Sequence, residues 1–363
     1  MNTVVQDDAS NPSIVDDEVL HALARRSLGV DTEFVKALGI APTDKELVHA
    51  SGPIRLYRYK RSTPAVHPLP LLFVMSLINR YYIVDLARGR SLVEYLLSVG
   101  YDVYLIDWGR PRAAHSRQGL EHYVQQAIPE CMERVLEDSG ESKLTMVSYC
   151  LGGLLALLYA ALHPRGPLKN LVCLATPVNG EGMTNLRAWC SRSDFDVATL
   201  IDGSGNVPPE KVLIAMQLLR PLQQTASEVT LLGHVGDRAR TTDQLRLAYW
   251  VGDQVPFPGT AMRELVQGLL RDNDAMGQGM KVGRRRARLD AIKVPVLHVA
   301  AEHDHIVPLA SCSDLVGHVG SKDKQQIVVK GGHVSLVAGR NAQRRLWPEL
   351  HKWLEPRSQR RSH

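Results

Sequence analysis

One cysteine, Cys150, stands where a nucleophile could act. An apolar run typical of a strand, residues 144–147, precedes it, and a run typical of a helix, residues 154–162, follows Gly152 and Gly153. A reactive side chain on a sharp turn between strand and helix projects above the sheet, and glycines behind it let helix and strand approach closely. The alternative is that Cys150 is a small buried hydrophobe, the usual state of a free cysteine.

The turn after Cys150 also predicts hydrogen-bond donors for a developing negative charge. The Leu151 N–H lies at a helix N-terminus, where the helix dipole favours a thiolate or an oxyanion. A second donor is expected from the loop after the apolar run 71–75, at Ser76 or Leu77.

Two residues far along the chain could complete a catalytic site. Asp304 follows a predicted strand that ends near residue 300, and His333 follows the last predicted strand. The order nucleophile, acid, histidine is the order of the α/β-hydrolase triad. The alternatives are that Asp304 caps a helix, that His333 is an ordinary surface histidine, or that His303, Asp304 and His305 bind a metal. Adjacent loop residues rarely all face one ion, so no metal site is expected.

The elements around these residues predict an α/β-hydrolase fold, with a mostly parallel sheet and helices on both faces. Strand and helix patterns alternate up to residue 176 and resume near residue 294, while the intervening runs are helical. The predicted parts are an N-terminal helical and partly flexible segment, a core in two pieces, an inserted helical cap, and a basic flexible tail. The N-terminal segment spans residues 1–50 and the two pieces of the core span residues 51–176 and 291–356. The cap spans residues 177–290, and the tail spans residues 357–363.

Composition restricts the function classes. The 363 residues are 44% hydrophobic and 22% charged, with a net charge of +5, which is ordinary for a globular enzyme and gives no reason to expect a nucleic-acid partner. The five cysteines show no paired spacing, which favours a reducing compartment. We see no signal peptide in the first residues and no apolar run that could cross a bilayer, so a cytoplasmic location is expected.

Together the motifs resemble those of the polyhydroxyalkanoate synthases, in particular their short catalytic subunit. The family box reads Gly-x-Cys-x-Gly-Gly, and here it is Ser148-Tyr149-Cys150-Leu151-Gly152-Gly153. Further similar stretches are residues 77–86, 102–109, 176–178, 205–208, 304–308 and 331–333.

The resemblance implies an acyltransferase that joins 3-hydroxyacyl units, such as 3-hydroxybutyryl, into a polyester and releases CoA. Cys150 would attack the thioester, His333 would act as the base, and Asp304 would help to activate the hydroxyl of the bound acyl unit, directly or through the histidine. Contacts to substrate or CoA are expected from Tyr149, His305, Arg284 and Arg286.

The CoA thioester is the substrate, and no cofactor is expected. The resemblance to the two-component synthases implies a second subunit (PhaE or PhaR), homo-oligomerisation and a place at the polyester granule surface.

Ser148 departs from the family box, which has glycine at that position. We expect a side chain there to crowd the turn or to shift the nucleophile, because glycine lets a strained turn form. Two other functions therefore stay open. One is an acyl-CoA thioesterase or esterase in which water resolves the acyl-enzyme, and the other is a non-catalytic granule-associated subunit.

Overall fold

A computed structural model describes residues 37–62, 64–218 and 238–359. Its centre is an eight-stranded sheet in the order β1-β2-β4-β3-β5-β6-β11-β12. β1 and β2 pair antiparallel with their neighbours, and all other pairings in this sheet are parallel. The strands are β1 (Lys45–Ser51), β2 (Ile54–Tyr59), β3 (Leu71–Val74), β4 (Val103–Asp107), β5 (Leu144–Tyr149), β6 (Leu168–Leu174), β11 (Val296–Ala301) and β12 (Lys324–Val329).

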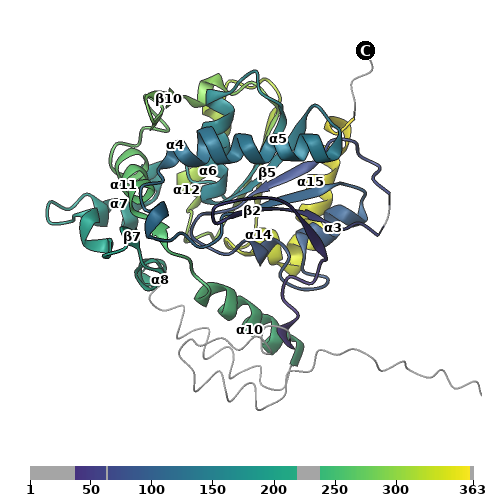
Figure 1. Ribbon diagram of the computed structural model, residues 1–363, viewed down its shortest axis with the longest axis horizontal. Helices are drawn as coiled ribbons and strands as arrows, with labels where there is room; N and C mark the ends of the chain where they lie inside the picture. The colour runs from purple at the N-terminus through teal and green to yellow at the C-terminus, as the bar shows by residue number, and fades with distance from the viewer. Residues whose placement is uncertain (1–36, 63, 219–237, 360–363) are drawn as a thin grey trace, which may run out of the picture.

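Helices cover both faces of this sheet (Figure 1). One face carries α4 (Leu120–His122), α5 (Ile128–Ser139) and α6 (Leu151–Leu162), and the other carries α3 (Leu92–Ser98), α14 (Ser335–Ala338) and α15 (Trp347–Leu354). The strand residues alternate between the two apolar clusters, so that Leu72 and Val74 of β3 join the first and Leu71 and Phe73 join the second. Because both faces are covered, the central strand β3 is a continuous buried apolar run, as predicted.

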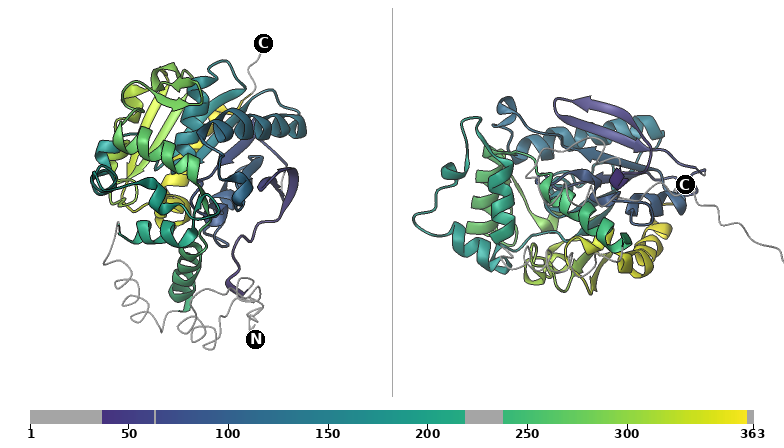
Figure 2. Two further views of the ribbon diagram at one scale, coloured as in Figure 1. Left: turned by 60° about the vertical axis from the view of Figure 1, so that its left-hand side comes forward. Right: turned by 90° about the horizontal axis from the view of Figure 1, so that it is seen from below.

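The chain between β6 and β11 forms a separate group of elements beside the carboxyl ends of the strands (Figures 1 and 2). In its described residues, 175–218 and 238–295, it contains α-helices, a π-helical turn, short 3₁₀-helices and two small two-stranded sheets. They include α7 (Thr184–Cys190), α8 (Pro209–Leu218), α10 (Arg238–Gly252), α11 (Gly259–Leu265), the π-helix Val266–Arg271, and the pairs β7 (Asn206–Val207) with β8 (Phe257–Pro258) and β9 (Met280–Val282) with β10 (Arg285–Ala287). The sequence pattern gave no sign of these short strands.

Several predicted boundaries differ from the structure. The sheet begins at Lys45, inside the segment expected to be helical, because residues 45–51 pair with β2. At the other end Ser358 is fully buried and Arg357 forms an ion pair with Asp323 at 2.7 Å, so the ordered chain extends into the predicted tail. Residues 1–36 and 360–363 lie outside the described residues.

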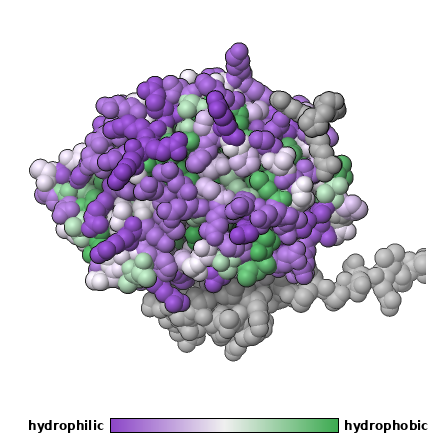
Figure 3. Space-filling view, turned by 45° about the horizontal axis from the view of Figure 1, so that its top comes forward, coloured by the Kyte–Doolittle hydropathy of each residue, from purple (hydrophilic) through white to green (hydrophobic). Residues whose placement is uncertain are grey.

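The surface is mainly polar on the face seen in Figure 3, with hydrophobic residues scattered singly. Within the described ranges, no helix is both long enough and apolar enough to cross a membrane.

Candidate active site

Cys150 occupies the sharp turn that the sequence predicts between β5 and α6. Its backbone has φ 56° and ψ −128°, a conformation that costs a non-glycine residue about 1–3 kcal/mol. The Cys150 N–H donates to the Leu174 carbonyl at 2.9 Å, which ties the turn to the end of β6. Only 7% of the cysteine surface is exposed. The strain and the tether together fix the direction of the thiol.

The two glycines behind Cys150 are required by close packing. A Cβ on Gly152 would lie 2.1 Å from the Val74 carbonyl oxygen, and a Cβ on Gly153 would lie 1.8 Å from the Thr176 hydroxyl oxygen. Real Cβ atoms do not approach other atoms so closely. The first turn of α6 therefore packs in direct backbone contact with the end of β3 and in contact with Thr176, just after β6.

Ser148 is accommodated inside the sheet. Its side chain is fully buried, and its hydroxyl donates to the Val172 carbonyl on β6 at 2.7 Å. The positive φ of the turn falls on Cys150 and not on Ser148. The expectation that Ser148 crowds the turn is therefore wrong, because its side chain lies between β5 and β6, away from the strained residue.

Asp304 and His333 meet at the carboxyl ends of β11 and β12. The His333 Nδ1 lies 2.7 Å from Asp304 Oδ2, and 7% and 5% of the two residues are exposed. The other carboxylate oxygen of Asp304 accepts the backbone N–H groups of Ile306 at 2.9 Å and Val307 at 2.8 Å. These bonds orient the carboxylate and leave Oδ2 for the histidine. These two bonds were not predicted from the sequence. An aspartate often accepts the backbone N–H groups of residues two and three positions later, and that tendency could have indicated them.

The charges around His333 favour its protonated form. Burial alone would lower its pKa, but the neighbouring Cys150 and Asp304, through charge and hydrogen bonds, raise the pKa of His333 to about 10. Since Nδ1 binds Asp304, it is Nε2 that faces the Cys150 sulfur. The geometry suits a cysteine paired with a histidine that a carboxylate supports.

The Leu151 N–H belongs to the first turn of α6, where helix N–H groups have no partner within the helix. The loop 75–80, which joins β3 to the 3₁₀-helix η1 (Tyr81–Val84), runs past the same turn, because the Val74 and Met75 carbonyls contact Gly152. Its first end is held by the Trp108 indole, which donates to the Met75 carbonyl at 2.8 Å. The predicted oxyanion donors at Ser76 or Leu77 are thus carried by a loop beside the nucleophile.

A cavity of about 140 Å³ opens beside Cys150. Its walls are almost entirely apolar and come mostly from the chain between β6 and β11. They include Ile78, Leu151, Trp189, Phe195, Met216, Phe257, Leu269 and Ile306, and Lys211 is the one charged residue among the lining residues that the structure describes. The Lys211 ammonium donates to the Thr199 carbonyl at 2.7 Å. The space next to the thiol therefore suits a neutral, apolar group.

The other predicted contact residues are not gathered at this cavity. Tyr149 is 2% exposed, and its ring lies 4.9 Å from the His333 ring, so it packs behind the histidine. Its hydroxyl donates to the His333 carbonyl at 3.3 Å. His305 is exposed and does not line the cavity.

Arg284 and Arg286 lie elsewhere, at the β9–β10 hairpin. Arg284 is exposed, and Arg286 pairs with Asp274 at 3.3 Å. Between them, Arg285 donates to the carbonyl of Leu162, the last residue of α6, about 18 Å along that helix from Cys150. The hairpin therefore packs against the far end of α6 and does not line the cavity at Cys150, and the expected contact of Arg284 and Arg286 with substrate or CoA stays a prediction. Within the described residues, no group of three or more histidine, cysteine, aspartate or glutamate side chains could hold a metal.

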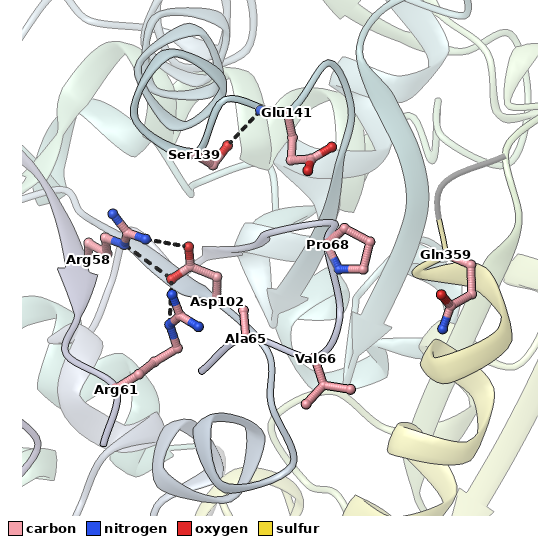
Figure 4. A pocket seen from close by; sticks show the side chains of 9 residues that line it. All are labelled: Arg58, Arg61, Ala65, Val66, Pro68, Asp102, Ser139, Glu141 and Gln359. Atoms are coloured by element: carbon pink, nitrogen blue, oxygen red, sulfur yellow. Dashed lines mark hydrogen bonds and ion pairs between the residues drawn. The ribbon is translucent and has the colours of Figure 1, made fainter. Parts of the chain in front are cut away.

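A larger cavity of about 550 Å³ lies among residues at the opposite, amino-terminal edge of the parallel strands (Figure 4). Arg58 and Arg61 both face Asp102 there, at 2.7 and 3.6 Å. Because these charges compensate one another and no nucleophile lies among them, this cavity lacks the chemistry of the Cys150 site.

The sheet order, the turn at Cys150 and the arrangement with Asp304 and His333 define an α/β-hydrolase. Residues 83–339 match the alpha/beta hydrolase fold family, and residues 22–96 match the N-terminus family of poly-beta-hydroxybutyrate polymerase (PhaC). A solved structure from Sulfolobus solfataricus shares the fold, with a TM-score of 0.58 and 16% identity over 86% of this chain and 93% of that one.

Curated relatives are closer in sequence. The poly(3-hydroxyalkanoate) polymerase subunit PhaC of Allochromatium vinosum is 33% identical over 88% of this chain and 90% of its own length. The subunit of the same name from Thiocystis violacea is also 33% identical, again over 88% and 90%. The protein of that name from Synechocystis is 32% identical over 87% and 85%. The chain belongs to the PhaC family of poly(3-hydroxyalkanoate) polymerase subunits.

We predict that Gly153→Ala lowers the free energy of unfolding by about 1–3 kcal/mol, because the added methyl group overpacks the contact with Thr176. Urea denaturation measures this. Gly203→Ala is the matched control, since a Cβ there meets nothing within 4 Å. Equal free energies of unfolding for the two variants would contradict the close contact between Gly153 of α6 and Thr176.

We predict that Cys150 is alkylated before the other four cysteines. We also predict that the pH dependence of its alkylation follows the protonation of His333. Burial raises the pKa of Cys131, Cys173 and Cys312 to about 12, and also raises that of Cys190. A cation beside the sulfur attracts anionic iodoacetate. The rate ratio of iodoacetate to neutral iodoacetamide should therefore be high below pH 10 and fall as pH rises through about 10.

Peptide mass spectrometry identifies which cysteine is labelled. The same rates are then measured for the variant Asp304→Asn. Removing the carboxylate removes one cause of the raised pKa of His333, so the midpoint of the ratio should move down by about 1–3 pH units. A ratio that does not change with pH would contradict the ion pair. Uniform labelling of all five cysteines would contradict a special role for Cys150.

Proposed function

We propose that the chain is a catalytic subunit that polymerises 3-hydroxyacyl-CoA, such as 3-hydroxybutyryl-CoA, into polyester through an acyl group on Cys150. The observation that carries the proposal is the Cys150–His333–Asp304 arrangement beside an apolar cavity. Relatives with 33% identity over most of the chain are poly(3-hydroxyalkanoate) polymerase subunits, which supports the same reaction.

In the first step the Cys150 thiolate attacks the thioester carbonyl. The negative charge moves to the carbonyl oxygen, where the Leu151 N–H and a donor at Ser76 or Leu77 stabilise it. The bond between the acyl carbon and the CoA sulfur then breaks, and the departing sulfur takes the proton from His333 Nε2. The products are free CoA and an acyl-cysteine beside a neutral histidine.

In the second step the hydroxyl of another 3-hydroxyacyl unit attacks the acyl-cysteine. His333 Nε2 accepts the hydroxyl proton, an ester bond forms, and Cys150 leaves as a thiolate, which restores the ion pair. Asp304 acts through the histidine in this scheme, because His333 and two backbone N–H groups occupy its carboxylate oxygens. This geometry favours the indirect role for Asp304 over direct contact with the substrate hydroxyl.

The apolar cavity bears on the choice between polymer transfer and hydrolysis. Water that enters a site competes with the incoming hydroxyl for the acyl-enzyme, and a closed apolar site reduces that competition. Among the described residues of the lining, Lys211 is the only charged one, and it is bound to a backbone carbonyl and so is not free to hold water near the thioester. This supports transfer over the thioesterase alternative.

We further propose that the chain works with a second synthase subunit and as an oligomer at the granule surface. The relatives from Allochromatium vinosum and Thiocystis violacea are named as polymerase subunits, which supports a partner. The reaction requires no cofactor in this scheme, since the CoA thioester brings both the acyl group and the leaving group.

We predict that the purified chain releases CoA from 3-hydroxybutyryl-CoA and forms insoluble polymer, with faster release when a PhaE-type or PhaR-type subunit is added. Chromatography of the quenched, protein-free reaction mixture measures CoA, and sedimentation with ester hydrolysis measures polymer. Cys150→Ala should abolish both, because no other described cysteine contacts His333. CoA release with free acid alone would favour the thioesterase, and no release with or without partner would favour a non-catalytic subunit.

A further inference from the structure

The loop 75–80, which carries the proposed oxyanion donors, is held at its far end by a segment from a distant part of the chain. This segment, residues 250–255, spans the end of α10 and the turn after it. Three consecutive loop residues make hydrogen bonds to it. The bonds run from Trp250 Nε1 to the Arg80 carbonyl (2.9 Å), from Asn79 Nδ2 to Gln254 Oε1 (3.2 Å), and from the Val255 N–H to the Ile78 carbonyl (3.5 Å).

Asp253 is the charged centre of this contact. Its carboxylate accepts the Tyr82 hydroxyl at 2.9 Å and the Arg110 guanidinium, and lies 3.8 Å from Arg80 Nε. Only 15% of the Asp253 side chain is exposed. Arg110 also donates to the Gln254 carbonyl at 3.0 Å. The Asp253 carboxylate thus binds Tyr82 of η1, which follows the loop, and Arg110, which lies in the turn after β4.

The loop needs such support because of what it does. An oxyanion donor is effective when it lies about 2.7–3.1 Å from the developing charge, and a shift of about 1 Å can reduce the rate a hundredfold. The first end of the loop is fixed by β3 and by Trp108. Ile78, in its middle, lines the same cavity as Cys150. The position of the donors therefore depends on how the second end is held.

We propose that Asp253 is a positioning residue for the oxyanion donors of the loop 75–80. Asp253 therefore couples two processes. When α10 docks against the loop 75–80, the same contacts bring the oxyanion donors into position. The proposal rests on the proposed acyl-transfer function. It assigns Asp253 no contact with the substrate.

The test separates two reactions of the same thiol. Alkylation by iodoacetamide displaces iodide directly and forms no oxyanion, so it requires only the Cys150–His333 pair. Acylation by 3-hydroxybutyryl-CoA or by p-nitrophenyl butyrate passes through a tetrahedral oxyanion. The ratio of acylation rate to alkylation rate therefore reports the oxyanion donors, and it is insensitive to the fraction of folded protein.

We expect Asp253→Ala to lower this ratio about tenfold to a hundredfold for both acyl donors, with alkylation within about twofold of the parent. Asp253→Asn keeps an acceptor for Tyr82 and Arg110 and should recover part of the loss. Release of CoA or p-nitrophenolate in the first turnover and the iodoacetamide rate are the measurements.

Asp243→Ala is the matched control. Asp243 is a buried carboxylate on α10, whereas Asp253 directly follows that helix. Asp243 binds Arg90 at 2.7 Å, Arg340 at 2.8 Å and Arg246 at 3.2 Å, away from the loop 75–80. Its loss should lower the melting temperature but leave the ratio within about twofold. A similar fall of the ratio in the control would show that general loosening of α10 is the cause, and would overturn the proposal.

Two further outcomes would also overturn it. One is an unchanged ratio in Asp253→Ala, and the other is a parent chain that is alkylated at Cys150 but acylated by neither donor. A parent that accepts p-nitrophenyl butyrate but not the CoA thioester would instead contradict the proposed function alone. In that case the ester still measures the effect of Asp253.

Discussion

The structure depends on the contact between the first turn of α6 and the ends of β3 and β6. Gly152 and Gly153 allow backbone and hydroxyl atoms to come closer than any side chain would permit. That approach forces Cys150 into a left-handed conformation and places the Leu151 N–H beside the thiol. The strain of about 1–3 kcal/mol is small against the burial of the apolar α6, whose residues 152–162 are all buried. Packing of the helix thus holds the nucleophile in its strained position.

Charge is the second constraint at the site. A buried histidine would ordinarily lose its proton, and only the neighbouring Cys150 and Asp304 reverse that tendency for His333. The backbone N–H groups of Ile306 and Val307 keep the carboxylate in place to do so. The three residues come from three different strand ends, so the sheet order brings the charges together. Removing any one of them would leave the others in a poorly solvated environment.

The sequence predicted the parts of the fold that have strong local patterns. Continuous apolar strands, the glycines after Cys150, and an acid and a histidine after strand ends were enough to place the three main residues. The place of Arg284 and Arg286 at the far end of α6 could not be predicted, because a basic run carries no information about which end of that helix its hairpin contacts. Support from Asp253 and Tyr149 was invisible, because it depends on contacts across more than 170 residues of chain. Ser148 was misjudged because the strained φ falls two residues later.

The origin of the cavity walls has an evolutionary consequence. All but five of the lining residues come from the chain between β6 and β11, whereas Cys150, Asp304 and His333 lie at strand ends of the sheet. Substitutions that reshape the space beside Cys150 can therefore accumulate without altering Cys150, Asp304 or His333. Under the proposed function, family members can diverge in the monomers they incorporate while these three residues stay the same, so selection can act on polymer composition and on turnover independently.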